Sequence, residues 1–578
     1  MADTMPKAGV IPDRRTPGGA RRGGVERLWR RSVDRYPENG RRFAYLGITV
    51  LAAVILYYQL YVPAAVTPSI ISHYHATWSF FVYILVVGNA VGAFASLVAG
   101  LADRWGRANI VTYGLLVTAL LVLFGLPNAP NIWAYATLYS VLCVIEGMCL
   151  VALPALVRDF TPQMGRASAM GFYTMGPVLG SLVVAQVASH TLSHLHAWQD
   201  QFVIAGIVGL VAFSIALFFL RELSPGLRDQ LMVSIKDRAL VEARAAGVNI
   251  DESIKHPWRQ ILHLDVIGPS VGIATFLMIY YAFVAFFVVY MATIYGYSEQ
   301  RANSLGNWMW AANAIGVVII GFLSDRLRVR KPFMVVGAIG AIAFTALFAL
   351  RTNQTGTGYY QFVWIISLLA IFLGTAYSPW MAAFTETVEK RNPALTATGL
   401  AVWGWTIRAV VSISFLVTPF VVTSMTPLID QGAHVKALAS QYSAQLTTLG
   451  AIDPATVGKL QANPSDTAAI GTAVTEISQK LNVSPAAAVQ QLIAVSKVPT
   501  ADLTYLQANG PKVQKALGIA PGEWRRWWWV CLGGEVLFLP LIFLLKGRWS
   551  PKRARQDEEE HERMVDRELA ALLSSHSG

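Results

Sequence analysis

Long apolar runs recur along almost the whole chain and limit what it can fold into. A helix needs about 20 mainly apolar residues to cross the hydrocarbon layer of a bilayer. The composition agrees: a soluble protein of 578 residues with 54% hydrophobic and 14% charged residues would leave much apolar surface in water. We therefore predict an all-α polytopic membrane protein. Its twelve predicted spans are 43–65, 78–100, 110–127, 132–157, 167–189, 201–220, 266–291, 302–322, 333–350, 359–384, 397–422 and 527–545.

A short motif of glycine, aspartate and arginine occurs twice, in the loops after the second and the eighth predicted span. Its two aspartates, Asp103 and Asp325, lie 222 residues apart. Six predicted helices return the chain to its starting face, so the two halves enter the membrane in the same orientation and form a parallel repeat. The motif residues are Gly100, Asp103, Arg104, Gly106 and Arg107 in the first copy, and Gly321, Asp325 and Arg326 in the second.

The doubled motif resembles the signature of the major facilitator superfamily, a family of secondary transporters with twelve helices in two six-helix halves. The run from Gly176 and Pro177 to Gly180 in the fifth span also resembles a motif of that family. The resemblance implies transport by alternating access. It also implies that the charged motif residues stabilise the outward-open state and separate on switching. An alternative is that these charges only determine the topology.

The distribution of basic residues predicts the orientation. With the N-terminus in the cytoplasm, 35 of the 46 Lys and Arg lie on the cytoplasmic side, ten lie outside and Arg408 lies within a span. The positive-inside rule favours this arrangement, with both termini cytoplasmic, in a plasma (inner) membrane. The net charge of +12 then follows from topology and attraction to anionic lipid, and we expect no nucleic-acid partner.

The predicted spans divide the chain into two halves, a linker, an insertion and two tails. The stretch between the last two spans lacks arginine from 424 to 523 and contains repeated helix-start signals, such as Asp453-Pro454 and Ser484-Pro485. It predicts a small extracytoplasmic helical domain. The predicted units are a disordered basic cytoplasmic tail (1–42), the first half (43–220), a cytoplasmic linker (221–264), the second half (265–422 and 526–545), the insertion (423–525) and a cytoplasmic tail (546–578).

Three charged residues fall near the middle of predicted spans: Glu146, Arg408 and Glu535. Each costs roughly 2.5–3.5 kcal/mol on insertion scales, so a charge at this depth marks a functional candidate. Glu146 is suited to carry a proton, and the planar guanidinium of Arg408 is suited to bind a carboxylate or phosphate. The alternative is that these charges form fixed structural pairs.

Aromatic and amide residues in the spans are candidates for the wall of a binding cavity, because they combine stacking surfaces with hydrogen-bonding tips. The selected residues are Tyr58, Gln59, Trp308 and Trp403. The four tryptophans at 524 and 527–529 are interpreted as an interfacial belt.

These patterns predict a transporter of a small polar organic metabolite, with an organic anion and proton symport favoured. Its partners are the substrate, protons and the bilayer, and we expect a monomer. Proton-coupled efflux of amphiphilic compounds is an alternative, although Cys143 stands where the resembled drug antiporters carry an arginine. A second alternative is a membrane sensor that uses the insertion. Because no phosphate-cradling loop, nucleophile elbow or metal-ligand spacing occurs, we expect no enzyme activity, cofactor or metal.

Overall fold

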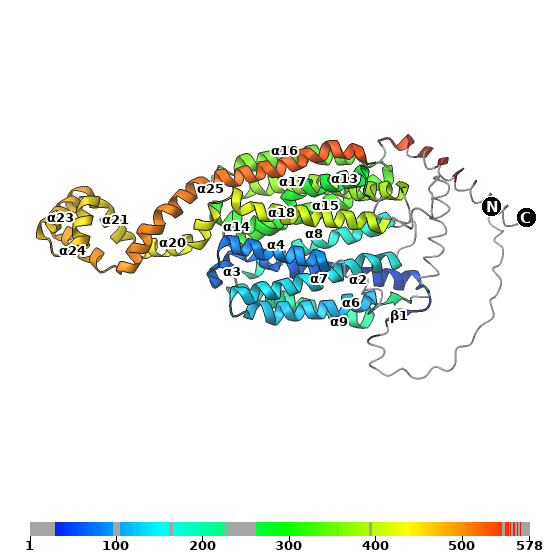
Figure 1. Ribbon diagram of the computed structural model, residues 1–578, viewed down its shortest axis with the longest axis horizontal. Coiled ribbons are helices and arrows are strands. Elements are labelled where there is room, and N and C mark those ends of the chain that lie inside the picture. The colour runs from blue at the N-terminus through cyan, green and yellow to red at the C-terminus, as the bar shows by residue number, and fades with distance from the viewer. Residues whose placement is uncertain are drawn as a thin grey trace, which may run out of the picture.

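The computed structural model describes residues 29, 31–95, 105–160, 166–224, 227, 262–354, 356–391, 396–545 and scattered positions within 549–567. Eleven helices in these ranges are long and apolar enough to cross a membrane. A twelfth, α8 (Arg166–Thr191), runs beside them (Figure 1). Gly100, Asp103, Arg104 and most of the predicted tails and linker lie outside the described residues.

The first half of the bundle contains six long helices, and its third helix continues into a π turn and a short 3₁₀ turn. α2 packs against α8 and α9, α4 against α7, and α6 against α7 and α9. The described elements are α2 (Asn39–Ala65), α3 (Thr67–Tyr74), α4 (Trp78–Ala95), α6 (Arg107–Leu120), the turns Leu121–Gly125 and Leu126–Asn128, α7 (Ile132–Phe160), α8 and α9 (Trp198–Phe219).

The second half repeats this arrangement with the equivalent helices of the second repeat. α15 packs against α17, α16 against α17 and α25, and α13 against α18 and α25. The elements are α13 (Leu264–Phe276), α14 (Met278–Tyr295), α15 (Glu299–Leu327), α16 (Lys331–Arg351), α17 (Tyr359–Arg391), α18 (Thr396–Val421), α25 (Thr500–Leu541) and the short turn Ile542–Leu544.

The halves meet through pairs of helices, one from each half. α8 packs against α15, α4 against α18, and α2 against α14. These helices occupy equivalent positions in the repeat, so the interface has approximate twofold symmetry. A site shared by both halves must lie between these pairs.

A short parallel pair of strands ties the beginning of the chain to the end of the first half. β1 (Ser32–Val33) pairs with β2 (Glu222–Leu223). Next to β1, the buried Arg31 donates hydrogen bonds to Thr112 Oγ1 at 3.0 Å and to the carbonyl oxygen of Ala216 at 2.9 Å. These bonds give partners to a guanidinium that would be costly to bury alone. The last part of the stretch predicted as a disordered tail, residues 31–42, is therefore in contact with the first half.

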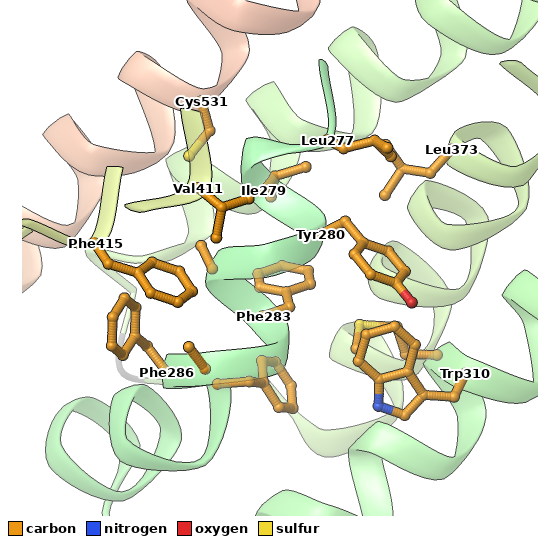
Figure 2. Close-up of a cluster of buried hydrophobic side chains, with 14 of the residues drawn as sticks. Leu277, Ile279, Tyr280, Phe283, Phe286, Trp310, Leu373, Val411, Phe415 and Cys531 are labelled. Carbon is orange, nitrogen blue, oxygen red and sulfur yellow. The ribbon is translucent and has the colours of Figure 1, made fainter. Parts of the chain in front are cut away.

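The seventh span is broken near its middle, whereas the sequence predicted one run over 266–291. At Leu277 the backbone leaves helical geometry (φ −83°, ψ 5°), which separates α13 from α14. The break lies within a buried cluster in which Phe286 of α14 packs on Phe415 of α18, with ring centroids 5.0 Å apart (Figure 2). Packing from several helices therefore supports the irregular backbone, as a membrane interior requires.

The insertion stands out from one end of the bundle, here called the insertion end (Figure 1). Its small core contains Ile452, Ala473, Ile477 and Ala488. α25 is 42 residues long and runs from the insertion into the bundle without interruption. The other helices of the insertion are α19 (Met425–Asp430), α20 (Gly432–Gln441), α21 (Ser443–Ala451), α22 (Pro454–Ala462), α23 (Thr467–Leu481) and α24 (Pro485–Ser496).

The predicted tryptophan belt on α25 is wrong. Trp524, Trp527 and Trp528 are at most 1% exposed, and only Trp529 is on the surface. The ring of Trp528 lies 5.3 Å from that of Tyr290 on α14 and 5.3 Å from that of Phe348 on α16, measured between centroids. Because these rings fill the space between three helices, they hold α25 against α14 and α16. They do not face lipid headgroups.

Candidate functional site

Glu146 and Arg408 come from opposite halves and carry opposite charges. Glu146 on α7 is 2% exposed, and its Oε1 has no hydrogen-bond partner within the described structure. Arg408 on α18 is partly buried. A buried carboxylate with an unpartnered oxygen, on a helix near the interface between the halves, is a functional candidate.

Small residues bring the two charges near each other. α4 and α7 cross so closely at Gly92 and Gly147 that a Cβ atom on Gly147 would meet the carbonyl oxygen of Gly92. On α4, the amide of Asn89 donates to the carbonyl oxygen of Arg408 at 3.3 Å and to Ser412 Oγ at 2.9 Å. Close packing of α4 on α7, with Asn89 bonded to α18, places Glu146 beside the second half.

Tyrosines from both halves lie around this region. Tyr139 precedes Glu146 by two helical turns on α7 and is buried. The ring of Tyr280 lies 5.1 Å from that of Trp310, and both are labelled in Figure 2. A cavity of about 30 Å³ between the halves is lined by Tyr61, Ser181 and Trp310, among others. A cavity of this size can hold water. Its wall is mainly apolar, with Tyr61, Ser181, Asn303 and Trp310 as the polar exceptions, and it does not include Glu146 or Arg408.

The four other predicted cavity residues have varied surroundings. Gln59 is buried against its own half, where its Oε1 accepts from Thr118 Oγ1 at 2.7 Å. The Tyr58 hydroxyl is buried without a partner in the described structure. Trp308 is 52% exposed, and Trp403 packs on Trp380 of its own half with ring centroids 6.1 Å apart. None of these contacts joins the two halves.

Glu535 is buried between two helices of the second half. Its Oε1 accepts from Thr345 Oγ1 of α16 at 2.8 Å, whereas its Oε2 has no partner in the described structure. The surrounding helices, α16 and α25, belong to the same half. Glu535 therefore does not share the interface that holds Glu146.

The first loop motif continues into a charged contact at the start of α6. Gly106 has a positive φ of 88°, and Arg107 forms an ion pair with Asp159 of α7 at 2.9 Å. The backbone N–H of Arg107 donates to Glu222 Oε2 at 2.8 Å, so Glu222 caps the helix. Both side chains of the ion pair are at most 12% exposed, and the contact joins α6 to α7.

The second loop motif makes the equivalent contact in the other half. Asp325 pairs with Arg330 at 2.7 Å, and Arg330 also approaches Glu386 of α17 at 3.3 Å. Gly321 packs against Ser378 of the same helix, and Arg326 is exposed. In the described residues, Arg107 thus ties the third helix of the first half to the fourth. In the second half, Arg330, which follows the motif, ties Asp325 of α15 to Glu386 of α17.

At the insertion end, hydrogen bonds cross the interface between the halves. Asn303 of α15 donates to the carbonyl oxygen of Ala65 at 3.0 Å, and Asn307 donates to Ser189 Oγ of α8 at 2.8 Å. Gln300 donates to the carbonyl oxygen of Ser189 at 3.2 Å. The halves are therefore closed at this end of the bundle.

Residues 49–415 match the family model of the Major Facilitator Superfamily. The chain belongs to the Major Facilitator Superfamily. It is therefore a transporter of that superfamily, and the interface between its halves is the place where its substrate site is sought.

Similarity to individual superfamily members is low. Sugar phosphate exchanger 3 of Homo sapiens is 23% identical over 363 residues, which cover 57% of this chain and 71% of that protein. The D-galactonate transporter of Escherichia coli is 24% identical over 236 residues, which cover 38% and 54%. A solved inward-facing, unoccupied structure of a bacterial homologue of the human lysosomal transporter Spinster has a TM-score of 0.55. It is 15% identical and covers 89% of this chain and 100% of that one. This likeness shows the fold.

Several residues of this superfamily member were missed from the sequence. Asp159 and Glu386 each lie near the end of the fourth helix of a half, 227 residues apart, whereas the motif aspartates are 222 apart. That similar spacing was a signal that could have identified them. Asn89 gave no such signal, because many polar residues in spans bond within their own half.

Proposed function

We propose that this transporter moves a small organic anion together with protons, by alternating access around Glu146 and Arg408. The observation that carries the proposal is the buried Glu146 carboxylate, whose Oε1 has no partner in the described structure. Its helix packs on α4, and Asn89 of α4 bonds to Arg408 of the other half. An anion bound at Arg408 would compete with Glu146 for the cation. Protonation of Glu146 would free the guanidinium for the substrate, which couples the two events.

The anionic substrate class is further supported by the names of two relatives, one a sugar phosphate exchanger and the other a galactonate transporter. Both named substrates carry an acidic group. We also propose that the insertion faces outward and that the motif loops and both termini face the cytoplasm of a plasma membrane, as the distribution of basic residues favours. The closed insertion end then corresponds to an inward-facing conformation, and a monomer suffices for transport.

The test is anion-dependent proton entry into liposomes that contain the purified protein and an internal pH dye. Sugar phosphates, sugar acids, neutral sugars and amphiphilic cations are added in turn to the wild type, to Glu146→Gln and to Arg408→Ala. The proposal expects acidification with an acidic solute only, and loss of the signal in both variants. The matched control is Glu535→Gln. It tests whether removing the charge of any buried carboxylate abolishes the acidification.

Other outcomes would contradict the proposal. Proton release from the liposomes with amphiphilic cations would favour efflux, which the aromatic walls near Tyr280 and Trp310 would suit. Silence with every solute, in a protein that still binds a ligand through the insertion, would favour the sensor. An equal signal in the wild type and Glu146→Gln would remove Glu146 from coupling.

A further inference from the structure

Two carboxylates of the second half cap helices of the first half at the insertion end. Glu299, the first residue of α15, accepts from the backbone N–H of Ser69 through Oε1 at 2.8 Å and from Ser69 Oγ through Oε2 at 2.9 Å. Asp430, the last residue of α19, accepts from the backbone N–H of Trp78 through Oδ1 at 2.9 Å. Both carboxylates therefore reach across the interface between the halves.

These are positions where a helix needs an acceptor. The first N–H groups of a helix have no partner within it, and a carboxylate there also interacts well with the helix dipole. α3 has no side-chain cap from its own segment, so Glu299 supplies one. At the start of α4, Thr77 accepts from Phe80 and leaves the N–H of Trp78 to Asp430. If the carboxylates withdrew while this end stayed closed, these N–H groups would lose their partners.

Trp78 anchors the same contact through its side chain. Its indole is fully buried, and its ring lies 5.4 Å from that of Phe286 on α14, measured between centroids. The start of α4 is thus held by the second half at two points, its backbone by Asp430 and its ring by Phe286. Moving the halves apart at this end must separate both contacts.

Asp430 belongs to the base of the insertion, and that base is fixed to the second half. Glu523 of α25 accepts from the N–H of Ser424 at 2.8 Å and from Thr423 Oγ1 at 2.7 Å. The indole of Trp524 donates to the sulfur of Met425 at 3.3 Å. α19 also packs against α3 and α4 of the first half. The insertion therefore moves with the second half and contacts the first half through its base.

We propose that Asp430 and Glu299 form a latch that holds the insertion end closed, so that the base of the insertion is part of the gate. The latch engages when the halves meet at this end and releases when they separate. The insertion is then coupled to the conformational cycle, because a force or ligand that moves α19 away from α4 opens the gate.

The test measures the distance between the halves without using transport. Spin labels are attached to cysteines introduced at the exposed His194 in the first half and Gln354 in the second. The native Cys143, Cys149 and Cys531 are buried, which keeps background labelling low. Electron–electron dipolar spectroscopy then gives the fraction of molecules with a longer distance, in detergent and in lipid nanodiscs.

Asp430→Ala and Glu299→Ala should each raise the separated population by about threefold or more, because each leaves a helix N–H without its charged partner. The matched control is Asp453→Ala, which removes a carboxylate cap from α22 within the insertion, where Asp453 accepts from the N–H of Ala455 at 3.0 Å. This control should leave the distances unchanged.

Unchanged distances in folded Asp430→Ala protein would overturn the role of the insertion base. An equal shift in Asp453→Ala would show a general effect of destabilising the insertion, which would also overturn it. Asp430→Asn, which keeps an acceptor oxygen, gives a second check: it should shift the distances less than Asp430→Ala. Because no substrate is used, these results are independent of whether the proposed anion transport is correct.

Discussion

Asn89 of the first half donates a 2.9 Å hydrogen bond to Ser412 Oγ of the second half, one helical turn beyond Arg408. The same amide donates to the carbonyl oxygen of Arg408 itself. Asn89 is therefore a link between α4 and the helix that carries the proposed anion-binding cation. Its position connects the closure of the halves with the placement of Arg408.

Replacing Asn89 with alanine should weaken substrate binding by about tenfold or less, because two modest hydrogen bonds that position α18 are lost. Binding is measured by isothermal titration or by the concentration dependence of proton entry. The control is Asn128→Ala, since Asn128 bonds only to the nearby carbonyl oxygen of Phe124 in an exposed turn. Equal affinities for the two variants would contradict a positioning role for Asn89.

A methyl group at Gly106 should destabilise the protein by about 1–2 kcal/mol, because this residue has φ 88° and L-residues are strained there. The added Cβ would also meet Oε1 of Glu222, the side chain whose Oε2 caps α6. Thermal unfolding in detergent measures the effect. Gly40→Ala is the control, since a Cβ at that helical glycine meets nothing within 4 Å. A Gly106→Ala protein as stable as the control would contradict this reading of the motif.

Trp528→Ala should cost about 3–5 kcal/mol, the range for deleting a fully buried aromatic side chain. The neighbouring Trp529→Ala should cost much less, because Trp529 is 41% exposed. Unfolding followed by tryptophan fluorescence and by circular dichroism measures both variants in parallel. Similar losses would mean that the aromatic cluster does not hold α25 to α14 and α16.

The spans were predictable because the bilayer imposes length and apolarity on each helix separately. The repeat of the motif is visible in the sequence for a similar reason: glycine and charge recur in both halves. The second copy lies within α15 rather than in a loop, and Gly100, Asp103 and Arg104 of the first lie outside the described residues. The superfamily match confirms the overall interpretation. Properties that depend on one helix alone, or on its repeat, can thus be inferred from the sequence.

Residues whose role depends on which neighbour they meet could not be predicted. Gln59 has the composition of a cavity residue, yet its carbonyl oxygen bonds to Thr118 of its own half. The tryptophans of α25 have the composition of a lipid interface but pack on Tyr290. The break at Leu277 could not be predicted from a proline either. The nearest proline, Pro269, lies within α13. Tertiary packing decides each case.

The central claim is that Glu146 couples protons to a substrate held by Arg408. The most direct test compares proton-driven accumulation of the transported anion with exchange of labelled for unlabelled anion at equilibrium, in liposomes. Glu146→Gln should lose accumulation and keep exchange, because the binding cation remains while the proton site is gone. Arg408→Ala should lose both. Accumulation by Glu146→Gln at the wild-type level would contradict the claim.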